Sequence, residues 1–118
     1  MLATRSNVYI VDDDSSFGKS MKRLLDARGI VSEYFGSAQS FLDSVPPDAA
    51  GYAIVDIHMP VCDGFALMDK MHEGHYGMSV IVITGHAQAD IREEAMKKGA
   101  VGFLQKPFSE ESLLELLH

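Results

Sequence analysis

The sequence predicts an α/β fold in which a parallel sheet is covered by helices on both faces. Short apolar runs alternate with longer amphipathic segments along the 118 residues, which is the pattern of successive βαβ units. The apolar runs are nearly continuous, as expected for strands that are buried on both sides. A barrel built from the same units needs about 250 residues. We therefore expect one doubly wound domain over residues 1–118.

The first half of the chain predicts two strands, each followed by a helix. The strands are the runs at 8–11 and 31–35, and Glu33 in the second run indicates an edge strand. Gly29 ends the first helix, Ser37 caps the second, and Pro46-Pro47 ends it. The residues at helical spacing on the inward faces are Phe17, Met21, Leu24, Leu25 and Arg28, then Ala38, Phe41, Leu42 and Val45.

The second half predicts three more strands, at 52–55, 80–83 and 101–104. Helices are expected from Asp63 to about Met71 and over 88–98, and Ser109 caps a last helix. The residues expected to face the core from these helices are Leu67, Met68, Met71, Ile91, Ala95, Leu113, Leu114 and Leu117. The result is a doubly wound five-stranded parallel sheet in the flavodoxin-like order 2-1-3-4-5.

Composition and charge exclude several classes of function for this domain. Ten basic residues against 17 acidic ones give a net charge of −7, so we expect no direct binding of nucleic acid or membrane by this domain. The single cysteine, Cys62, excludes an internal disulfide and a thiolate metal cluster. No apolar run approaches the ~20 residues of a membrane span, and the N-terminus lacks the apolar stretch of a signal peptide. These features predict a cytoplasmic location.

Polar residues follow four of the predicted strands at the point where each strand ends. Asp12 and Asp13 follow the first strand, Asp56 the third, and Thr84 and Lys106 the fourth and fifth. Strands 1 and 3 flank the crevice in which ligands bind in this strand order. Three carboxylates there repel one another and favour a hard divalent cation such as Mg²⁺. With the lysine and the hydroxyl opposite, they predict a receptor for a phosphoryl group in which one carboxylate is the nucleophile.

Each of these residues also has an ordinary structural explanation. Acidic residues at strand ends often cap the next helix, which is the interpretation that we favour for Asp14 or Ser15. A Lys-Pro pair is commonly a surface turn, and a threonine often ends a strand. Because all of the signals occur in order at one edge of the sheet, together they favour a functional site.

Four motifs cover this edge: Val11-Asp12-Asp13, Val55-Asp56-Ile57-His58-Met59-Pro60 with Asp63-Gly64, Ile83-Thr84-Gly85, and Lys106-Pro107-Phe108. In order and separation they resemble the receiver domain of bacterial two-component response regulators, over nearly the whole chain. The segments Thr84-Gly85-His86-Ala87 and Lys106-Pro107-Phe108 are also similar to those of regulators that carry a C-terminal helix-turn-helix domain. Because the last helix is cut off without a cap, we expect the N-terminal part of a longer regulator.

The resemblance implies a role for each site residue. Asp56 would take a phosphoryl group from a sensor histidine kinase or phosphotransfer protein. Asp13, Asp56 and the backbone carbonyl of His58 would bind Mg²⁺ or Mn²⁺, and Asp12 would act on the metal through water. Thr84 and Lys106 would hold the phosphoryl oxygens, and Lys106-Pro107 would be a cis peptide.

The resemblance also implies how the signal leaves the domain. Phe103 would swing inward as Thr84 moves toward the phosphoryl group, which would reshape the face of helix 4, strand 5 and helix 5. That face would control a DNA-binding output domain or form a phosphorylation-dependent homodimer. The domain would promote its own phosphorylation and dephosphorylation without being a turnover enzyme. His58 and His86 would overhang the phosphoryl group and set its lifetime between pH 6 and 8, unless both imidazoles simply point into solvent.

Two other functions stay open from the residues. A phosphatase of the haloacid dehalogenase type also has a nucleophilic aspartate after a buried strand. It needs a second aspartate two residues later, where this chain has His58, and usually a cap domain. A degenerate receiver that only mediates protein contacts is the other alternative, and the complete set of site residues disfavours it.

Overall fold

The computed structural model of the protein describes residues 8–85 and 89–117. Its five strands form one sheet in the order β2-β1-β3-β4-β5, and every neighbouring pair is parallel, as the sequence predicts. The strands are β1 (Val8–Val11), β2 (Ser32–Phe35), β3 (Tyr52–Asp56), β4 (Ser79–Thr84) and β5 (Gly102–Gln105). The helices are α1 (Ser15–Ala27), α2 (Ala38–Ser44), α3 (Gly64–Glu73), α4 (Ala89–Lys97) and α5 (Glu110–Leu116).

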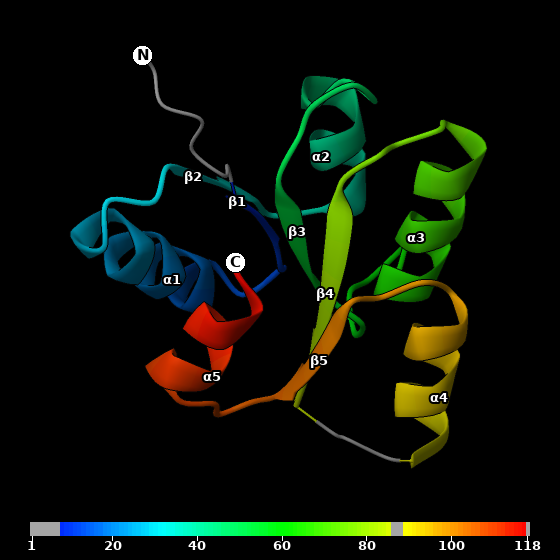
Figure 1. The fold of residues 1–118 in the computed structure, drawn as a ribbon. Coiled ribbons are helices and arrows are strands. Elements are labelled where there is room, and N and C mark those ends of the chain that lie inside the picture. Colours follow the sequence, from blue (N-terminus) through cyan, green and yellow to red (C-terminus); the bar gives the residue numbers. More distant parts are fainter. Residues whose placement is uncertain (1–7, 86–88, 118) are drawn as a thin grey trace.

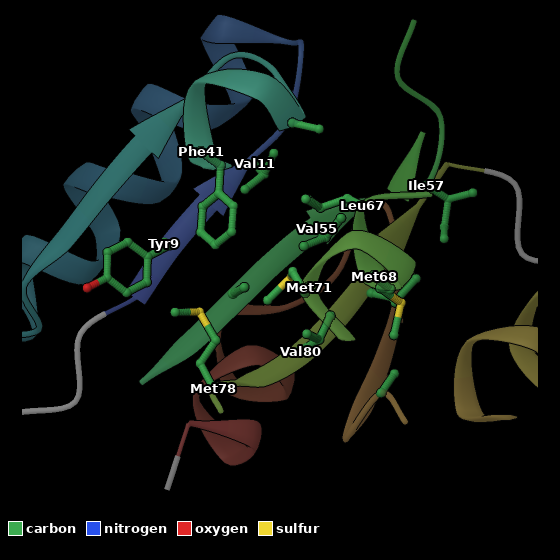
Figure 2. Packing of buried hydrophobic residues seen from close by; sticks show 14 of the residues in the cluster. Tyr9, Val11, Phe41, Val55, Ile57, Leu67, Met68, Met71, Met78 and Val80 are labelled. Atoms are coloured by element: carbon green, nitrogen blue, oxygen red, sulfur yellow. The ribbon is translucent and has the colours of Figure 1, made fainter. Parts of the chain in front are cut away.

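The sheet is the middle of three layers. Helices α1 and α5 cover one face, and α2, α3 and α4 cover the other (Figure 1). Side chains of β1 alternate between two apolar clusters: Val8 and Ile10 join the one that contains α1 and α5 residues, and Tyr9 and Val11 join the other. In the second cluster, Phe41 of α2 packs edge-on against Tyr9, with ring centroids 6.1 Å apart (Figure 2). Because both faces are buried, polar side chains can gather only at the edges of the sheet.

Side-chain caps fix where the helices begin. The residues whose side chains accept a hydrogen bond from a first-turn backbone N–H each stand directly before their helix: Asp14 before α1, Ser37 before α2, Asp63 before α3 and Ser109 before α5. This confirms the predicted caps at Ser37 and Ser109, and it makes Asp14 a helix cap. Asp63, expected as the first residue of its helix, lies one position before it. Within the described residues, none of the helices is long and apolar enough to span a bilayer.

Three details of the expected packing are wrong. Arg28 caps the C-terminal end of α1 and is exposed, and its guanidinium bonds to Glu110 of α5. Leu114 is half-buried and belongs to neither apolar cluster, whereas Leu116 packs against the cluster of α1 and α5. Val101 is 49% exposed and precedes the last strand. Leu113 and Leu116 are three residues apart and therefore share the face of α5 that packs on the cluster, whereas Leu114 lies beside that face.

Candidate functional site

Three carboxylates meet at the carboxyl edge of the sheet, between β1 and β3. Val11 of β1 pairs with Val55 of β3, so the two strands end side by side and the residues that come next, Asp12 and Asp56, lie close together. Asp12, Asp13 and Asp56 each offer a carboxylate oxygen, and these three atoms lie within 4.8 Å of one another. Asp12 is fully buried and Asp56 is 5% exposed, whereas Asp13 is exposed. The structure therefore brings together the three acids that stand out in the sequence.

Lys106 and Thr84 complete the set from the neighbouring strands. Lys106 follows β5, and its Nζ lies 2.7 Å from Asp12 Oδ2 and 3.9 Å from Asp56 Oδ2. Thr84 is fully buried at the end of β4, and its carbonyl oxygen accepts a 2.7 Å hydrogen bond from the Lys106 backbone N–H. The peptide between Lys106 and Pro107 is cis, as the resemblance implies. All five predicted site residues thus occupy one edge of the sheet.

The Asp56 carboxyl is strongly affected by this setting. Burial raises its pKa from the ordinary 3.8 to about 6, and the charge of Asp12 adds to the rise. The Lys106 ammonium and a hydrogen bond from the backbone N–H of His58, 3.2 Å from Asp56 Oδ1, lower the pKa in part. One lysine does not offset three neighbouring carboxylates. The site therefore carries excess negative charge that a bound cation would neutralise.

The donor set fits a small divalent cation. Carboxylate oxygens are hard ligands of the kind that Mg²⁺ and Mn²⁺ prefer. The exposed position of Asp13 leaves one side of the cluster open to solvent, and Mg²⁺ usually keeps several waters. Asp12, by contrast, already binds Lys106, which agrees with an indirect role for this carboxylate toward a metal.

Two glycines and a tyrosine shape the site in a way that the sequence pattern does not reveal. The Tyr34 hydroxyl of β2 donates a 2.7 Å hydrogen bond to the backbone carbonyl of Asp12. A Cβ on Gly18 of α1 would lie 2.2 Å from the Tyr34 ring, so only glycine lets this ring reach Asp12. A Cβ on Gly64 of α3 would lie 2.6 Å from the Asp56 carbonyl oxygen. For Gly18 the sequence does offer one signal, because a glycine inside a helical pattern often marks a close packing contact.

The remaining predicted residues have less defined settings. Phe103 of β5 is half-buried and packs against the cluster on the side of α2, α3 and α4. This position is compatible with both a core aromatic and a moving one, so its switch role stays a prediction. His58 is exposed in the loop after β3. His86 lies outside the described residues.

Residues 8–118 match the response regulator receiver domain. The chain belongs to this family. Relatives of the receiver include the transcriptional regulatory protein FixJ of Bradyrhizobium diazoefficiens, 35% identical over 116 residues, which are 98% of this chain and 57% of FixJ. The response regulator protein TodT of Pseudomonas putida is 37% identical over 92% of this chain and 48% of TodT. The chain thus spans about half the length of these relatives.

Solved structures agree with the family. The crystal structure of FixJ-N has a TM-score of 0.88 at 33% identity, covering 97% of this chain and 91% of that one. The structure of the response regulator StyR has a TM-score of 0.89 at 33% identity, covering 97% of this receiver and 58% of StyR. The flavodoxin-like fold predicted from the sequence is therefore confirmed, and membership of the receiver family disfavours the alternative of a haloacid dehalogenase phosphatase.

Proposed function

We propose that this receiver accepts a phosphoryl group on Asp56 and uses the aspartyl phosphate to change its surface. The observation that carries the proposal is the arrangement at the edge of the sheet. Three carboxylates lie within 4.8 Å, and the Lys106 ammonium stands 2.7 Å from one of them and 3.9 Å from Asp56. Such a set binds a divalent cation and a phosphoryl group together, which supports this function over a degenerate receiver.

Each group has a task in the transfer. A carboxylate oxygen of Asp56 attacks phosphorus in line, while the bond from phosphorus to the imidazole nitrogen of the donor breaks and the imidazole leaves with the electron pair. Lys106 is close enough to move from the acids to a phosphoryl oxygen. Asp13, Asp56 and the His58 carbonyl would hold Mg²⁺ or Mn²⁺, which when bound neutralises charge on the phosphoryl group. Asp12 keeps Lys106 in place and would reach the metal through water.

The signal would pass through Thr84 and Phe103. Thr84 ends β4, and its backbone carbonyl accepts a hydrogen bond from the backbone N–H of Lys106. The two residues expected to bind the phosphoryl oxygens are therefore connected through their backbones. The Thr84 hydroxyl can bond to a phosphoryl oxygen only in the phosphorylated form, and this bond raises the population of the arrangement in which the hydroxyl points to the phosphoryl group. Movement there would change α4, β5 and α5, the elements that follow in the chain.

The curated relatives support a place in transcription control. FixJ is named as a transcriptional regulatory protein and TodT as a response regulator, and this receiver matches about half of each. We propose a cytoplasmic protein with a sensor histidine kinase or phosphotransfer protein upstream and a DNA-binding output domain downstream. Phosphorylation would control the output domain directly or through a homodimer. The receiver would act as a switch on itself and not as an enzyme with an external substrate.

The experiment follows amide exchange with and without acetyl phosphate and Mg²⁺. Phosphorylation should change protection over residues 89–105 in the parent. Thr84→Ala should take up the phosphoryl group but lack this change, because the methyl group cannot bond to a phosphoryl oxygen. No exchange response in the labelled parent would contradict the switch. A full response in Thr84→Ala would contradict the route through Thr84.

Of the two histidines expected to set the lifetime of the phosphoryl group, His58 is the one whose position the structure describes. It is exposed two residues after Asp56, and its backbone already bonds to the Asp56 carboxylate. The family resemblance places its side chain beside the phosphoryl group, and histidine side chains in general change charge in this range, so the dephosphorylation rate should vary between pH 6 and 8. His58→Ala should flatten this profile, and His86→Ala is measured beside it. Superimposable profiles for parent and variants would leave both histidines without a role.

A further inference from the structure

The Lys106 ammonium has a third neighbour besides the two carboxylates. Its Nζ lies 4.1 Å from the centroid of the Phe17 ring, within the range of a cation–π contact. The same nitrogen is 2.7 Å from Asp12 Oδ2 and 3.9 Å from Asp56 Oδ2. The ammonium thus lies between the nearby carboxylate of Asp12, the more distant carboxylate of Asp56 and the face of the Phe17 ring.

Phe17 makes two further contacts besides the one with Lys106. Its backbone N–H donates a 3.2 Å hydrogen bond to Asp14 Oδ1, which fixes Phe17 in the first turn of α1. Its ring meets Phe108 edge-on, with centroids 6.0 Å apart and planes at 80°. The first turn of α1 therefore fixes the place of Phe17, while Phe108 meets only the edge of its ring and leaves the ring face to Lys106.

An open space lies beside this contact. A cavity of about 430 Å³ is lined by Phe17, Phe108, Pro107 and the Lys106 stem, together with Met21 and Leu24 of α1. Phe17 and Lys106 both line this space, so removing the Phe17 ring would enlarge it beside Lys106 and leave the side chain more room to move. The ammonium is therefore in contact with the aromatic face while it lies closer to Asp12 than to Asp56.

We propose that Phe17 is a positioning residue for phosphoryl transfer: it holds Lys106 where the ammonium can pass from Asp12 and Asp56 to the incoming phosphoryl oxygens. This inference rests on the proposed function. In the reaction with acetyl phosphate, the phosphorus–oxygen bond to acetate breaks, acetate leaves with the electron pair, and a bond from Asp56 to phosphorus forms. A lysine that is already in place lowers the cost of the charge that develops on the transferring group.

The test compares three variants by the rate of phosphorylation with acetyl phosphate and Mg²⁺. Phe17→Leu keeps an apolar side chain but removes the aromatic face, and should be roughly 3- to 10-fold slower. Phe17→Trp offers a stronger aromatic face, for which the adjacent cavity gives room, and should match or exceed the parent. Phe108→Leu removes a ring from the same cavity but not from Lys106, and should stay within about twofold of the parent.

A second readout uses the metal-free protein and no phosphoryl donor. The Lys106 methylene protons next to Nζ should resonate upfield in the parent, because they lie over an aromatic ring. This upfield shift should persist in Phe17→Trp and Phe108→Leu and disappear in Phe17→Leu. The pattern shows in which variants an aromatic ring stays at the ammonium, so that the rates of phosphorylation can be compared with this contact.

The outcomes separate this inference from the function on which it rests. Phe17→Leu at the parent rate, Phe17→Trp as slow as Phe17→Leu, or Phe108→Leu as slow as Phe17→Leu would overturn the positioning role. Lys106 protons without an upfield shift in the parent would do the same. A parent protein that takes up no phosphoryl group at all would overturn the proposed function instead.

Discussion

Lys106→Met is expected to lower the free energy of unfolding of the metal-free protein at pH 7 by about 2–3 kcal/mol, somewhat less than the roughly 3–5 kcal/mol for a fully buried pair because the Lys106 side chain is 23% exposed. The methionine keeps most of the length of the side chain but removes the cation that lies 2.7 Å from Asp12. Asp12 is fully buried, so its carboxylate would lose its compensating charge in a place that water does not reach. Urea denaturation with and without Mg²⁺ measures the effect, and Mg²⁺ should restore part of the loss.

Lys98→Met is the matched control. Lys98 Nζ lies 2.8 Å from Asp69 Oδ1, almost the same distance, but the Asp69 side chain is 55% exposed. An exposed ion pair contributes at most about 1 kcal/mol, so this variant should lose much less stability than Lys106→Met. Equal losses in the two variants would contradict the view that burial at the acidic site makes Lys106 important.

Asp56→Asn is expected to have the opposite effect and to raise the stability of the metal-free protein at pH 7 by about 1–3 kcal/mol. The pKa of Asp56 is raised to about 6 in the folded protein, from 3.8. A raised pKa means that the contribution of Asp56 to stability is complete below pH 3.8 and is lost as pH rises through 6. Asparagine carries no charge, so it avoids this loss.

The pH profile distinguishes this cause from others. The advantage of Asp56→Asn should be small near pH 4, grow between pH 4 and 6, and level off above pH 7. Asp48→Asn, at an exposed position, should change stability by less than about 0.5 kcal/mol throughout. An advantage of Asp56→Asn that is the same at pH 4 and pH 7 would show that ionisation of Asp56 is not its source.

The sequence predicts the strands and their order well because each buried strand is a short apolar run that ends at a polar residue. At Val11 and Val55 the change to aspartate is abrupt, and parallel topology then places Asp12 and Asp56 side by side. The five site residues follow from this rule. The roles of these five residues in binding and transfer, like those assigned to Phe103 and the two histidines, come from the family resemblance and stay predictions.

The contacts that the sequence does not reveal depend on how each helix is rotated and packed against the sheet. The bond from Tyr34 to the Asp12 carbonyl requires Gly18 of α1 to face β2, and the spacing of apolar residues does not specify that contact. The rotation of α5 about its own axis is also not specified by the sequence, and for this reason Leu114 is expected to face the core where the structure has Leu116. The contact of Phe17 with Lys106 joins residues at opposite ends of the chain, so it appears only in three dimensions.

Mapping the phosphorylated residue tests the central claim most directly. The parent, Asp56→Asn and Asp13→Asn are incubated with acetyl phosphate and Mg²⁺, and intact masses and modified peptides are measured. We expect the parent to gain about 80 Da, the mass of one phosphoryl group, at Asp56. Asp13→Asn should be labelled more slowly at the same residue, because it loses one metal ligand, and Asp56→Asn should gain nothing. An Asp56→Asn protein labelled as fully as the parent would contradict the account.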